Sequence, residues 1–530
     1  MRTRTVLAAV AGLVSTAMVA GVPATTSAQA TERAPAAAQF TPRAISWHKC
    51  TDRDLRHAHA QCGMLVVPLD HADPASPTIR LAVSRVRHTR GPYRGIVVTN
   101  PGGPGASGTS LATLGQSVPG HVAQTYDWYG LDPRGVGASR PALSCDGGYF
   151  GWDRPSYVPH NRSISSYWRR TTENYAADCG SAAASELLPH LRTTDNARDF
   201  DILRRTVGAN KWTFYGFSYG TYLAQVYANL YPNRVKAMVL DGVLDPTRVF
   251  YRSNLDQDRA FQVTNDKFFA WVGKYPGIYH LGHGRKAVQR GYDRLRHRLE
   301  RHAAGGKVGP DELADALLLA SYYRPYYTLV APAWSALANH NRPGGIARLY
   351  RALNPAGPGA DNGYAVYVAT ECTDAPWPQD WATWRQDNWR VHHQAPFYTW
   401  ANAWYNAPCR TWPAASGPRF DVTGRGVKAP ILLTNETYDP ATPFPGALTV
   451  RSIFPTSALV EGVGGTSHAV SLSGIACTDN AVAALLRDGS LPKRRAGHHA
   501  DKRCPGLPAP APRAAGRPVA HRPLPVPVRW

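Results

Sequence analysis

At 530 residues, with 43% hydrophobic and 10% aromatic residues, the chain has enough apolar material to fold, which excludes an intrinsically disordered polymer. Its length allows one large core plus a second element, because single domains usually have roughly 100–250 residues. The formal net charge of +22 at pH 7 raises the question of a nucleic-acid partner.

Much of this positive charge lies at the two ends of the chain. Arg2 and Arg4 belong to the N-terminal segment, and residues 493–530 carry nine Lys or Arg against one Asp, so about +12 remains for the body. That remainder is spread without a basic helix or a base-stacking motif. Solubility, or weak attraction of the basic tail to an anionic cell wall, explains the charge more simply, and we expect no nucleic-acid partner.

The first 30 residues have the pattern of a secretory signal peptide. Two arginines precede a weakly apolar run over residues 6–22, and residues 28–30 (AQA) form a small-x-small cleavage site. The alternative is a membrane anchor, but no later segment approaches the roughly 20 apolar residues that a spanning helix needs. We therefore expect a signal peptide at 1–30, a propeptide or linker at 31–45, secretion to the extracellular space and no membrane span.

All eight cysteines follow this segment, and an even number in an exported chain predicts disulfides. No C-x-x-C pair indicates a metal site, and a free catalytic cysteine is the less favoured alternative. Pairing between sequence neighbours closes short loops and predicts the bonds Cys50–Cys62, Cys145–Cys179, Cys372–Cys409 and Cys477–Cys504.

Strand and helix patterns alternate along most of the chain. Short apolar runs predict strands at residues 65–69, 79–86, 95–100, 126–131, 212–215, 235–240, 431–435 and 458–460. Amphipathic runs predict helices at 194–206, 219–230 and 481–487. Such alternation indicates the α/β class, a mostly parallel sheet with flanking crossover helices.

The strand signals fade between residues 246 and 427, where helix formers, Tyr and Trp dominate, so we interpret this segment as an inserted helical cap. The core then comprises residues 46–245 and 428–504. The Pro/Arg-rich tail at 505–530 has no apolar face and is expected to be disordered. We expect the tryptophans of the cap to form its own core rather than a substrate wall: Trp377, Trp381, Trp384, Trp389, Trp400 and Trp404.

Residues 216–220 (GFSYG) are the only G-x-S-x-G pattern in the chain. The pattern lies between a predicted strand and a predicted helix, where a nucleophile elbow has to be. The turn strains the nucleophile, and the small residues on either side let strand and helix approach closely. Ser218 is therefore the predicted nucleophile.

A serine hydroxyl needs a base that accepts its proton, and in this fold the partners follow in the order serine, acid, histidine. Asp439 lies just beyond the strand at 431–435 in a turn-forming stretch, and His468 follows the last predicted strand. We predict Asp439 as the triad acid and His468 as the base. Glu436 is the alternative acid, and His498 or His499 the alternative base.

The oxyanion of the tetrahedral intermediate needs two N–H donors. Tyr219, directly after the nucleophile, supplies the first, and the glycine-rich loop at 100–105 (NPGGPG) supplies the second, with Gly103 as the candidate. The chemistry requires no metal or other cofactor.

A second glycine-containing loop, at 132–139 (DPRGVGAS), lacks the Walker lysine and the G-x-G-x-x-G spacing of nucleotide loops. We interpret it as a structural turn near the active site, in which Asp132 and Arg134 fix loops.

Together these segments resemble the secreted tripeptidyl aminopeptidases of actinobacteria, within the proline-iminopeptidase branch of α/β-hydrolase peptidases. The resemblance spans most of residues 45–505 and rests on residues 100–105, 132–139, 216–221 (GFSYGT) and 240–242 (LDG). It implies the triad Ser218, Asp439 and His468, and a helical cap that makes the enzyme an exopeptidase.

The resemblance also implies release of tripeptides from the free N-termini of peptides and proteins. Asn100 replaces the histidine of the iminopeptidase loop, which argues against single-residue proline release, and a proline preference at the cleaved bond stays open. An extracellular esterase or lipase with the same triad and a proline iminopeptidase remain as alternatives. A non-catalytic wall-binding protein is disfavoured by the intact triad.

An enzyme that measures a fixed length from the amino end needs an acidic group for the substrate ammonium. Glu371, Asp374 and Asp380 in the expected cap are the candidates, and the alternative is that they are ordinary surface or structural charges. We expect the protein to be a monomer.

Overall fold

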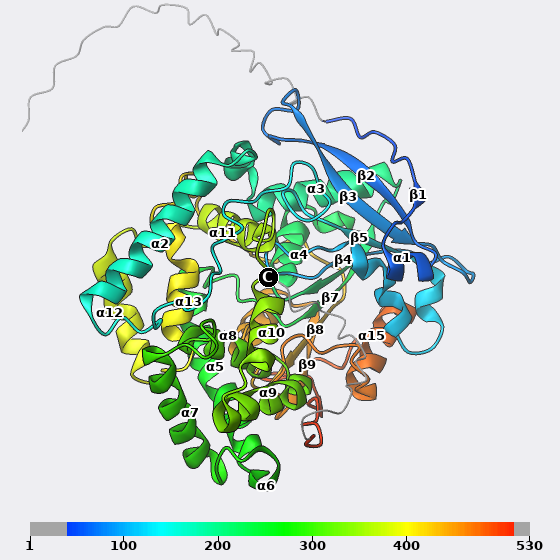
Figure 1. Cartoon of the computed structure of the whole chain (residues 1–530). Helices are drawn as coiled ribbons and strands as arrows, with labels where there is room; N and C mark the ends of the chain where they lie inside the picture. Colours follow the sequence, from blue (N-terminus) through cyan, green and yellow to red (C-terminus); the bar gives the residue numbers. More distant parts are fainter. Residues whose placement is uncertain (1–39, 514–530) are drawn as a thin grey trace, which may run out of the picture. The chain divides into compact units, whose positions relative to one another are not determined.

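In the computed structural model, which describes residues 40–513, ten strands form one sheet in the order β1-β2-β3-β5-β4-β6-β7-β8-β9-β10 (Figure 1). The strands β1, β2, β3 and β5 pair antiparallel, and all pairs from β5 to β10 are parallel. The predicted α/β class with a mostly parallel sheet is confirmed. The strands are β1 (His48–Lys49), β2 (Gln61–Pro68), β3 (Thr78–Val86), β4 (Gly95–Asn100), β5 (Tyr126–Leu131), β6 (Trp212–Phe217), β7 (Val235–Asp241), β8 (Ile431–Glu436), β9 (Ser457–Val463) and β10 (Lys502–Pro505).

Helices cover both faces of the sheet. Successive residues of a strand point to opposite faces, so apolar residues on both faces of the central strands pack against helices. Ile96 and Val98 of β4 belong to the same hydrophobic cluster as α3 and α4, whereas Val97 belongs to the cluster of η1 and α15. Strands that are buried on both faces read as continuous apolar runs, which is why the sequence predicts them well. The elements outside the cap are α1 (Arg53–His57), η1 (Thr109–Ser117), α2 (Arg162–Ser181), α3 (Thr193–Thr206), α4 (Tyr219–Leu230), α14 (Phe444–Ile453) and α15 (Ala476–Asp488).

The segment between β7 and β8 is helical and forms the cap. Its helices, green to yellow in Figure 1, are α5 (Tyr251–Val272), α6 (Pro276–Tyr279), α7 (Gly284–Arg301), α8 (Pro310–Tyr322), α9 (Tyr327–His340), α10 (Gly344–Leu353), α11 (Asn362–Asp374), α12 (Trp381–His392), α13 (Thr399–Asn406) and the short η6 (Ala407–Arg410). The expected division at residue 245 between core and cap does not describe α2. This helix belongs to the expected first part of the core, but it lies beside the cap helices α12 and α13 (Figure 1). Trp168 of α2 stacks on Trp404 with 6.2 Å between ring centroids.

The cap tryptophans pack on one another. Trp377 stacks on Trp384 at 5.7 Å and Trp381 on Trp404 at 5.0 Å between ring centroids. None of the six predicted core tryptophans lines the cavity that contains Ser218 in the described part of the chain. They are therefore packing residues and not a substrate wall. They do not form a separate cap core, because four of them belong to the hydrophobic cluster that also contains the sheet strands, and the other two pack against that cluster.

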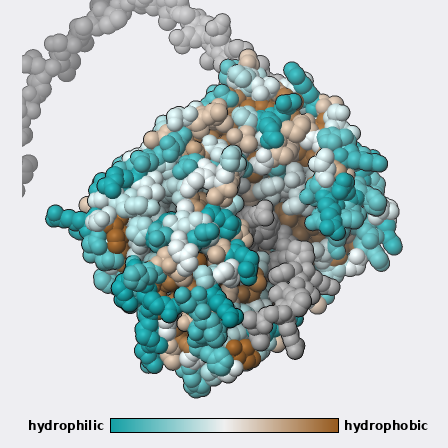
Figure 2. All heavy atoms as spheres, viewed as in Figure 1, coloured by the Kyte–Doolittle hydropathy of each residue, from teal (hydrophilic) through white to brown (hydrophobic). Residues whose placement is uncertain are grey.

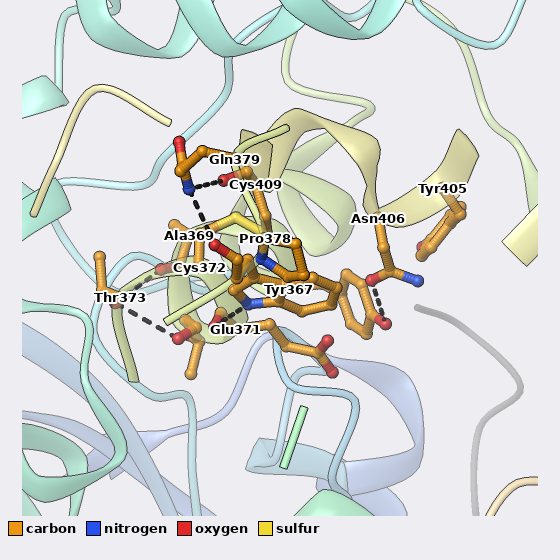
Figure 3. The surroundings of a disulfide bond; sticks show 12 residues. Tyr367, Ala369, Glu371, Cys372, Thr373, Pro378, Gln379, Tyr405, Asn406 and Cys409 are labelled. Carbon is orange, nitrogen blue, oxygen red and sulfur yellow. Dashed lines mark hydrogen bonds between the residues drawn. A yellow bond between two sulfur atoms is a disulfide. The ribbon is translucent and has the colours of Figure 1, made fainter. Parts of the chain in front are cut away.

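All eight cysteines lie within residues 40–513 and form the four predicted disulfides. Figure 3 shows one of them, Cys372–Cys409, which joins α11 to η6. Among the helices of the described residues, none has the length and apolar character required to cross a membrane.

The expected signal peptide, residues 31–39 and residues 514–530 lie outside the described residues. The expectation of a disordered tail from residue 505 is wrong for residues 505–513, which are held by polar contacts. The backbone N–H of Leu507 donates to Glu436 Oε1 (2.5 Å), the Arg324 guanidinium donates to the Leu507 carbonyl (2.6 Å), and Trp271 Nε1 donates to the Pro510 carbonyl (3.1 Å). The segment has no apolar face, but distant side chains satisfy its backbone groups.

The expectation that the chain has no basic helix is also wrong. Helix α7 carries seven Lys or Arg and two acidic residues among its 18 residues. Its four buried side chains, Val288, Tyr292, Leu295 and Leu299, follow the helical repeat, so most of its charges point outward.

Candidate active site

Ser218 occupies the sharp turn between β6 and α4. Its φ of 55° and ψ of −126° lie in a region that side chains other than glycine rarely adopt, as a nucleophile elbow requires. The backbone N–H of Ser218 donates to the Asp241 carbonyl at the end of β7 (2.9 Å), which fixes the turn. A Cβ atom on Gly216 would collide with the carbonyl of Gly220, so the small residues of the motif are needed for the close approach of strand and helix.

The side chains of His468 and Asp439 are paired. His468 Nδ1 lies 2.9 Å from both carboxylate oxygens of Asp439. Asp439 is 1% exposed and also accepts hydrogen bonds from the backbone N–H groups of Ala441 (3.0 Å) and Thr442 (2.9 Å). Because an ionised carboxylate only accepts hydrogen bonds, Nδ1 carries the proton, and Nε2 is left as the basic nitrogen.

Asp241 and Gly242, at the end of β7, lie next to both Ser218 and His468. The Ser218 N–H donates a hydrogen bond to the Asp241 carbonyl, and a Cβ atom on Gly242 would lie 2.8 Å from His468 Cε1. His468 Nε2 is buried and has no hydrogen-bond partner within residues 40–513. Catalytic hydrogen bonds are often completed only in the substrate complex, so this nitrogen is available to the serine hydroxyl.

The alternative acid and bases lie elsewhere. Glu436 accepts hydrogen bonds from the backbone N–H groups of Ser467 and Leu507, both at 2.5 Å, and burial raises its pKa to about 7. It therefore anchors the loop that carries His468 rather than the imidazole itself. His498 and His499 are exposed and do not line the cavity of Ser218.

The glycine-rich loop after β4 packs directly on the elbow. A Cβ atom on Gly102 would collide with the Phe217 carbonyl and lie 2.9 Å from Ser218 Cβ. Gly103 lines the same cavity as Ser218 and Tyr219. The loop therefore packs against the nucleophile turn, and the N–H groups of Gly103 and Tyr219 stay the predicted oxyanion donors.

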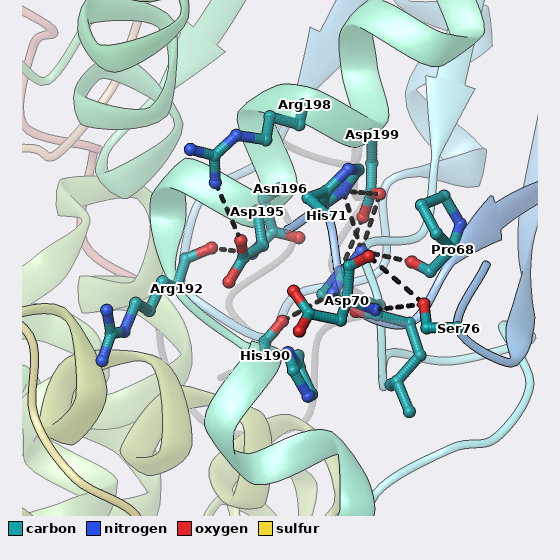
Figure 4. A network of polar contacts seen from close by, with 12 residues as sticks. Pro68, Asp70, His71, Ser76, His190, Arg192, Asp195, Asn196, Arg198 and Asp199 are labelled. Carbon is teal, nitrogen blue, oxygen red and sulfur yellow. Dashed lines mark hydrogen bonds and ion pairs between the residues drawn. The ribbon is translucent and has the colours of Figure 1, made fainter. Parts of the chain in front are cut away.

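Asp132 and Arg134 fix two different loops, in agreement with a structural turn. Asp132 Oδ1 accepts from the backbone N–H groups of Gly108 (2.9 Å) and Thr109 (3.0 Å), which continue the oxyanion loop. Arg134 makes a bidentate ion pair with Asp199, with Nε–Oδ2 and Nη2–Oδ1 distances of 2.8 Å. Figure 4 shows Asp199 together with its second partner, His71.

Residues of the cap form most of the wall of the cavity that contains Ser218. Its wall includes eight aromatic residues that belong to several segments: Phe150, Tyr157, Tyr219, Phe250, Tyr322, Tyr367, Tyr398 and Tyr405. Two carboxylates also line it, Glu371 of α11 and Asp315 of α8. Such a site, apolar in the main with a few polar groups, suits a ligand with a charged end.

The structure separates the three acidic candidates. Glu371, beside the disulfide in Figure 3, lines the cavity; its Oε2 is buried without a hydrogen-bond partner in the described chain, and burial raises its pKa to about 8. Asp374 does not line the cavity. Its carboxylate accepts from the backbone N–H (2.7 Å) and the hydroxyl of Thr193, so its expected contact with the substrate ammonium is not supported.

Asp380 is the N-cap of α12 and accepts from the Thr383 N–H at 2.8 Å, which is a structural role. Asp315 was not among the sequence candidates. The signal that could have indicated it is its spacing from Leu318 and Tyr322, which places the three on one helical face.

Comparison with known proteins agrees with this geometry. The alpha/beta hydrolase fold family model matches residues 95–473. The chain belongs to this family.

Relatives of similar length carry more specific names. The chain is 37% identical over 474 residues to a "Tripeptidyl aminopeptidase" of Streptomyces coelicolor, with 87% of this chain and 86% of that protein covered. It is 30% identical over 453 residues to "Serine protease Hip1" of Mycobacterium tuberculosis, with 82% and 86% covered. It is 27% identical over 466 residues to "Carboxylesterase B" of the same organism, with 84% and 88% covered.

Proposed function

We propose that this protein is a secreted serine exopeptidase that releases tripeptides from the free N-termini of peptides and proteins. The observation that carries the proposal is one cap-covered cavity that contains both the strained Ser218 and two acidic side chains. A cavity whose acidic side chains lie near the nucleophile favours a substrate that enters by a cationic end. The names of the Streptomyces and Mycobacterium relatives support peptide cleavage.

Catalysis follows from the arrangement at the elbow. His468 Nε2 accepts the proton of the Ser218 hydroxyl as its oxygen attacks the peptide carbonyl, and Asp439 stabilises the resulting imidazolium. The N–H groups of Tyr219 and Gly103 donate to the oxyanion. His468 then gives the proton to the leaving amine, the C–N bond breaks, and water hydrolyses the acyl-enzyme by the same route.

Recognition of the amino end follows from the buried acids. A carboxylate that is shielded from water interacts more strongly with an ammonium group than an exposed one does. Glu371, whose Oε2 lacks a partner in the described chain, and Asp315 are the two acids that line the cavity. The ionised form of Glu371 is disfavoured by burial, and a bound ammonium would reverse that.

An extracellular location is supported by the signal-peptide pattern and by the four disulfides, which persist in oxidising environments. We expect the enzyme to act as a monomer.

The test is hydrolysis of tripeptidyl anilides, with and without an N-acetyl group, by the purified mature enzyme and by Ser218→Ala. We expect cleavage only of the free-amine substrates and only by the wild type. A comparison of tripeptides that end in proline or alanine then measures the proline preference. Equal cleavage of the acetylated substrates would indicate an endopeptidase or a general hydrolase instead.

The relative named as a carboxylesterase favours a second candidate, an esterase with the same triad. Triad chemistry itself does not distinguish esters from amides. A short acyl p-nitrophenyl ester cleaved far faster than any free-amine peptide would support this alternative.

A further inference from the structure

One face of α8 runs along the cavity of Ser218. Asp315, Leu318 and Tyr322 line it, and their spacing places them on the same side of the helix. The Tyr322 end is fixed at the triad, because its carbonyl accepts a hydrogen bond from the His468 backbone N–H (2.9 Å) and the two rings lie 6.1 Å apart. Asp315 precedes Tyr322 by seven residues, which is about 10 Å along a helix axis.

Asp315 belongs to a cluster in which acids outnumber bases. Arg154 Nη2 lies 2.9 Å from Asp315 Oδ2, and Arg154 Nε lies 3.3 Å from Glu312 Oε1. Asp311 adds a third carboxylate, and its buried Oδ2 has no hydrogen-bond partner within residues 40–513. One guanidinium therefore faces three carboxyl groups, and burial raises the pKa of each of them. A second cation beside Asp315 would favour its ionised form.

Only one acid of this cluster reaches the cavity. The side chain of Asp315 is 13% exposed, whereas that of Glu312 is fully buried and caps α8 by accepting the Gly309 N–H (2.8 Å). The Tyr157 hydroxyl donates to Asp315 at 3.0 Å and orients the carboxylate. A carboxylate has about four acceptor sites, so capacity remains for a ligand.

Glu371 reaches the cavity from a different helix. A Cβ atom on Gly105 of the oxyanion loop would lie 3.0 Å from the backbone nitrogen of Tyr367, so α11 packs on this loop there. Glu371 follows Tyr367 by one helical turn, about 6 Å along the axis. The two cavity carboxylates thus enter from α8 and from α11.

We infer that Asp315 binds the α-ammonium of the substrate and that the length of α8 between Asp315 and the triad sets the product to three residues. The inference rests on the proposed exopeptidase function. An extended chain spans roughly 3.3–3.6 Å per residue, so three residues reach about 10 Å from the attacked carbonyl, which matches the separation along α8. In this arrangement Glu371, which enters the cavity from α11, lies beside the middle of the tripeptide.

The experiment measures kcat and KM for free-amine anilides of one, two, three and four alanines with wild type, Asp315→Asn and Glu371→Gln. We expect Asp315→Asn to raise KM for the tripeptidyl anilide by about ten- to a hundredfold, because a charge-assisted bond is lost. Its kcat should change little. Glu371→Gln should keep the preference for three residues.

Two further measurements distinguish the possible failures. The rate of Ser218 phosphonylation by a fluorophosphonate reports a folded elbow in each variant, and Asp315→Glu keeps the charge and should restore much of the tripeptide KM. If Asp315→Asn is phosphonylated normally and keeps the wild-type length profile, the assignment of Asp315 is wrong although the exopeptidase function stands. If the wild type itself cleaves acetylated and free substrates equally, the proposed function is wrong.

A second surface is defined by independent observations on α7. Arg290, Arg294, Arg298 and Arg301 are exposed and line one groove of the cap, together with His280 and His297. Figure 2 shows hydrophilic side chains over the part of the surface where Figure 1 places α7. The four arginines lie three or four residues apart, so they form a stripe about 16 Å long.

These guanidinium groups are available for a ligand. Among the described residues, Arg290, Arg294 and Arg301 have no acidic partner, whereas Arg296, at the side, pairs with Glu300 (3.9 Å). Arg298 makes one bond of 3.3 Å to the Leu337 carbonyl. Arginine binds phosphate oxygens in a bidentate way, and a row of four suits a polymer better than a single phosphate.

We propose that this arginine stripe binds an extended phosphate-containing polymer and holds the enzyme near such a surface. The test is the affinity for fluorescent long-chain polyphosphate, with inorganic phosphate as the competitor. Arg290→Gln, Arg294→Gln and Arg298→Gln combined should weaken binding at least tenfold, and added salt should weaken binding by the wild type. The matched control replaces exposed Arg53, Arg56 and Arg170 by Gln and removes the same charge.

The control should stay within twofold of the wild type, and tripeptidyl anilide hydrolysis should be unchanged in both triple variants. Equal loss of binding in the two variants would mean that net charge alone is responsible. Unchanged binding in the α7 variant, or equal competition by inorganic phosphate, would also overturn the proposal.

Discussion

The backbone N–H of His468 donates a 2.9 Å hydrogen bond to the carbonyl of Tyr322, the last residue of cap helix α8. The next turn of the cap reinforces the contact, because the Arg324 guanidinium donates to Thr466 Oγ1 (2.7 Å) and to the Gly464 carbonyl (2.6 Å). The loop that carries the predicted base is therefore held by the cap as well as by the sheet. Any displacement of α8 would move the imidazole relative to Ser218.

The first prediction concerns the nucleophile. Ser218→Ala should lower the hydrolysis of free-amine tripeptidyl anilides by more than about 10⁴-fold, because no other group can form the acyl-enzyme. The variant should also lose labelling by a fluorophosphonate while its circular dichroism spectrum stays that of the wild type. Activity within tenfold of the wild type would contradict the assignment.

The second prediction distinguishes the two acids near the end of β8. Asp439→Asn should lower kcat by about 10⁴-fold, since Nδ1 of His468 loses the carboxylate that fixes its tautomer. Glu436→Gln is the matched control, and it should keep kcat within about tenfold because Glu436 contacts the loop backbone and not the imidazole. The reverse order of effects would exchange their roles.

The third prediction tests the contact between the oxyanion loop and the elbow. Gly102→Ala should remove nearly all activity, because its Cβ atom would collide with the Phe217 carbonyl and push the loop away. Gly120→Ala is the control: Gly102 and Gly120 have φ of +94° and +73°, but nothing lies within 4 Å of a Cβ atom on Gly120. Both variants carry backbone strain, and only the first should lose turnover. Similar activity in the two would show that the loop does not position the oxyanion donors.

The fourth prediction concerns the pH dependence of stability. Burial raises the pKa of Glu371 to about 8, so the folded protein holds this proton at a pH where the unfolded chain has released it. The free energy of unfolding should therefore fall as the pH rises toward 8, by up to about 1.4 kcal/mol per pH unit from this group. Burial raises the pKa of Asp374 and Glu436 only to about 7. Of these three acids, Glu371 should therefore contribute most to the change in the free energy of unfolding between pH 7 and 8.

Glu371→Gln should flatten this part of the profile. Thermal unfolding of wild type and variant at pH 5.5, 7 and 8 provides the measurement, and the melting temperature of the variant relative to the wild type should rise steadily from pH 5.5 to pH 8. Parallel profiles would mean that Glu371 is ionised in the folded protein throughout this range.

The fifth prediction concerns the disulfide at the base of α11. Replacing Cys372 and Cys409 by alanine opens a loop with a sequence separation of 37. The free energy of unfolding should fall by about 4 kcal/mol on the chain-entropy estimate, against about 3 kcal/mol for Cys50 and Cys62, whose separation is 12. Denaturant unfolding measures both, and tripeptide hydrolysis should suffer only in the first variant, because α11 carries Glu371. A larger loss of activity from the Cys50–Cys62 replacement would contradict this.

Local patterns in the sequence were sufficient for the core of this protein. The strands at 95–100 and 126–131 and the helix at 219–230 are found with the predicted bounds, because buried strands and amphipathic helices are recorded in short-range periodicity. The elbow around Ser218 and the chain order of Asp439 and His468 were readable for the same reason. The disulfides could be paired because each closes a short loop.

Contacts between distant segments could not be read in this way. From the sequence, Asp374 and Glu371 are equal candidates for the substrate ammonium. Only the structure shows that the backbone N–H of Thr193 in α3 donates a hydrogen bond to the Asp374 carboxylate in α11. Asp315 lacks a motif, and it enters the cavity because α8 ends at His468. Residues 505–513 look unstructured by composition, yet Glu436 and Arg324 hold them.

The sequence by itself thus determined the fold class and predicted the nucleophile and its partners, because strands, helices and the elbow motif depend on neighbours within a few residues. Only the tertiary structure decided which acids face the cavity and which cap helix contacts the loop of the predicted base. Those properties depend on how helices from a long insertion pack across the sheet, and that packing is set by many weak contacts between residues far apart in the chain.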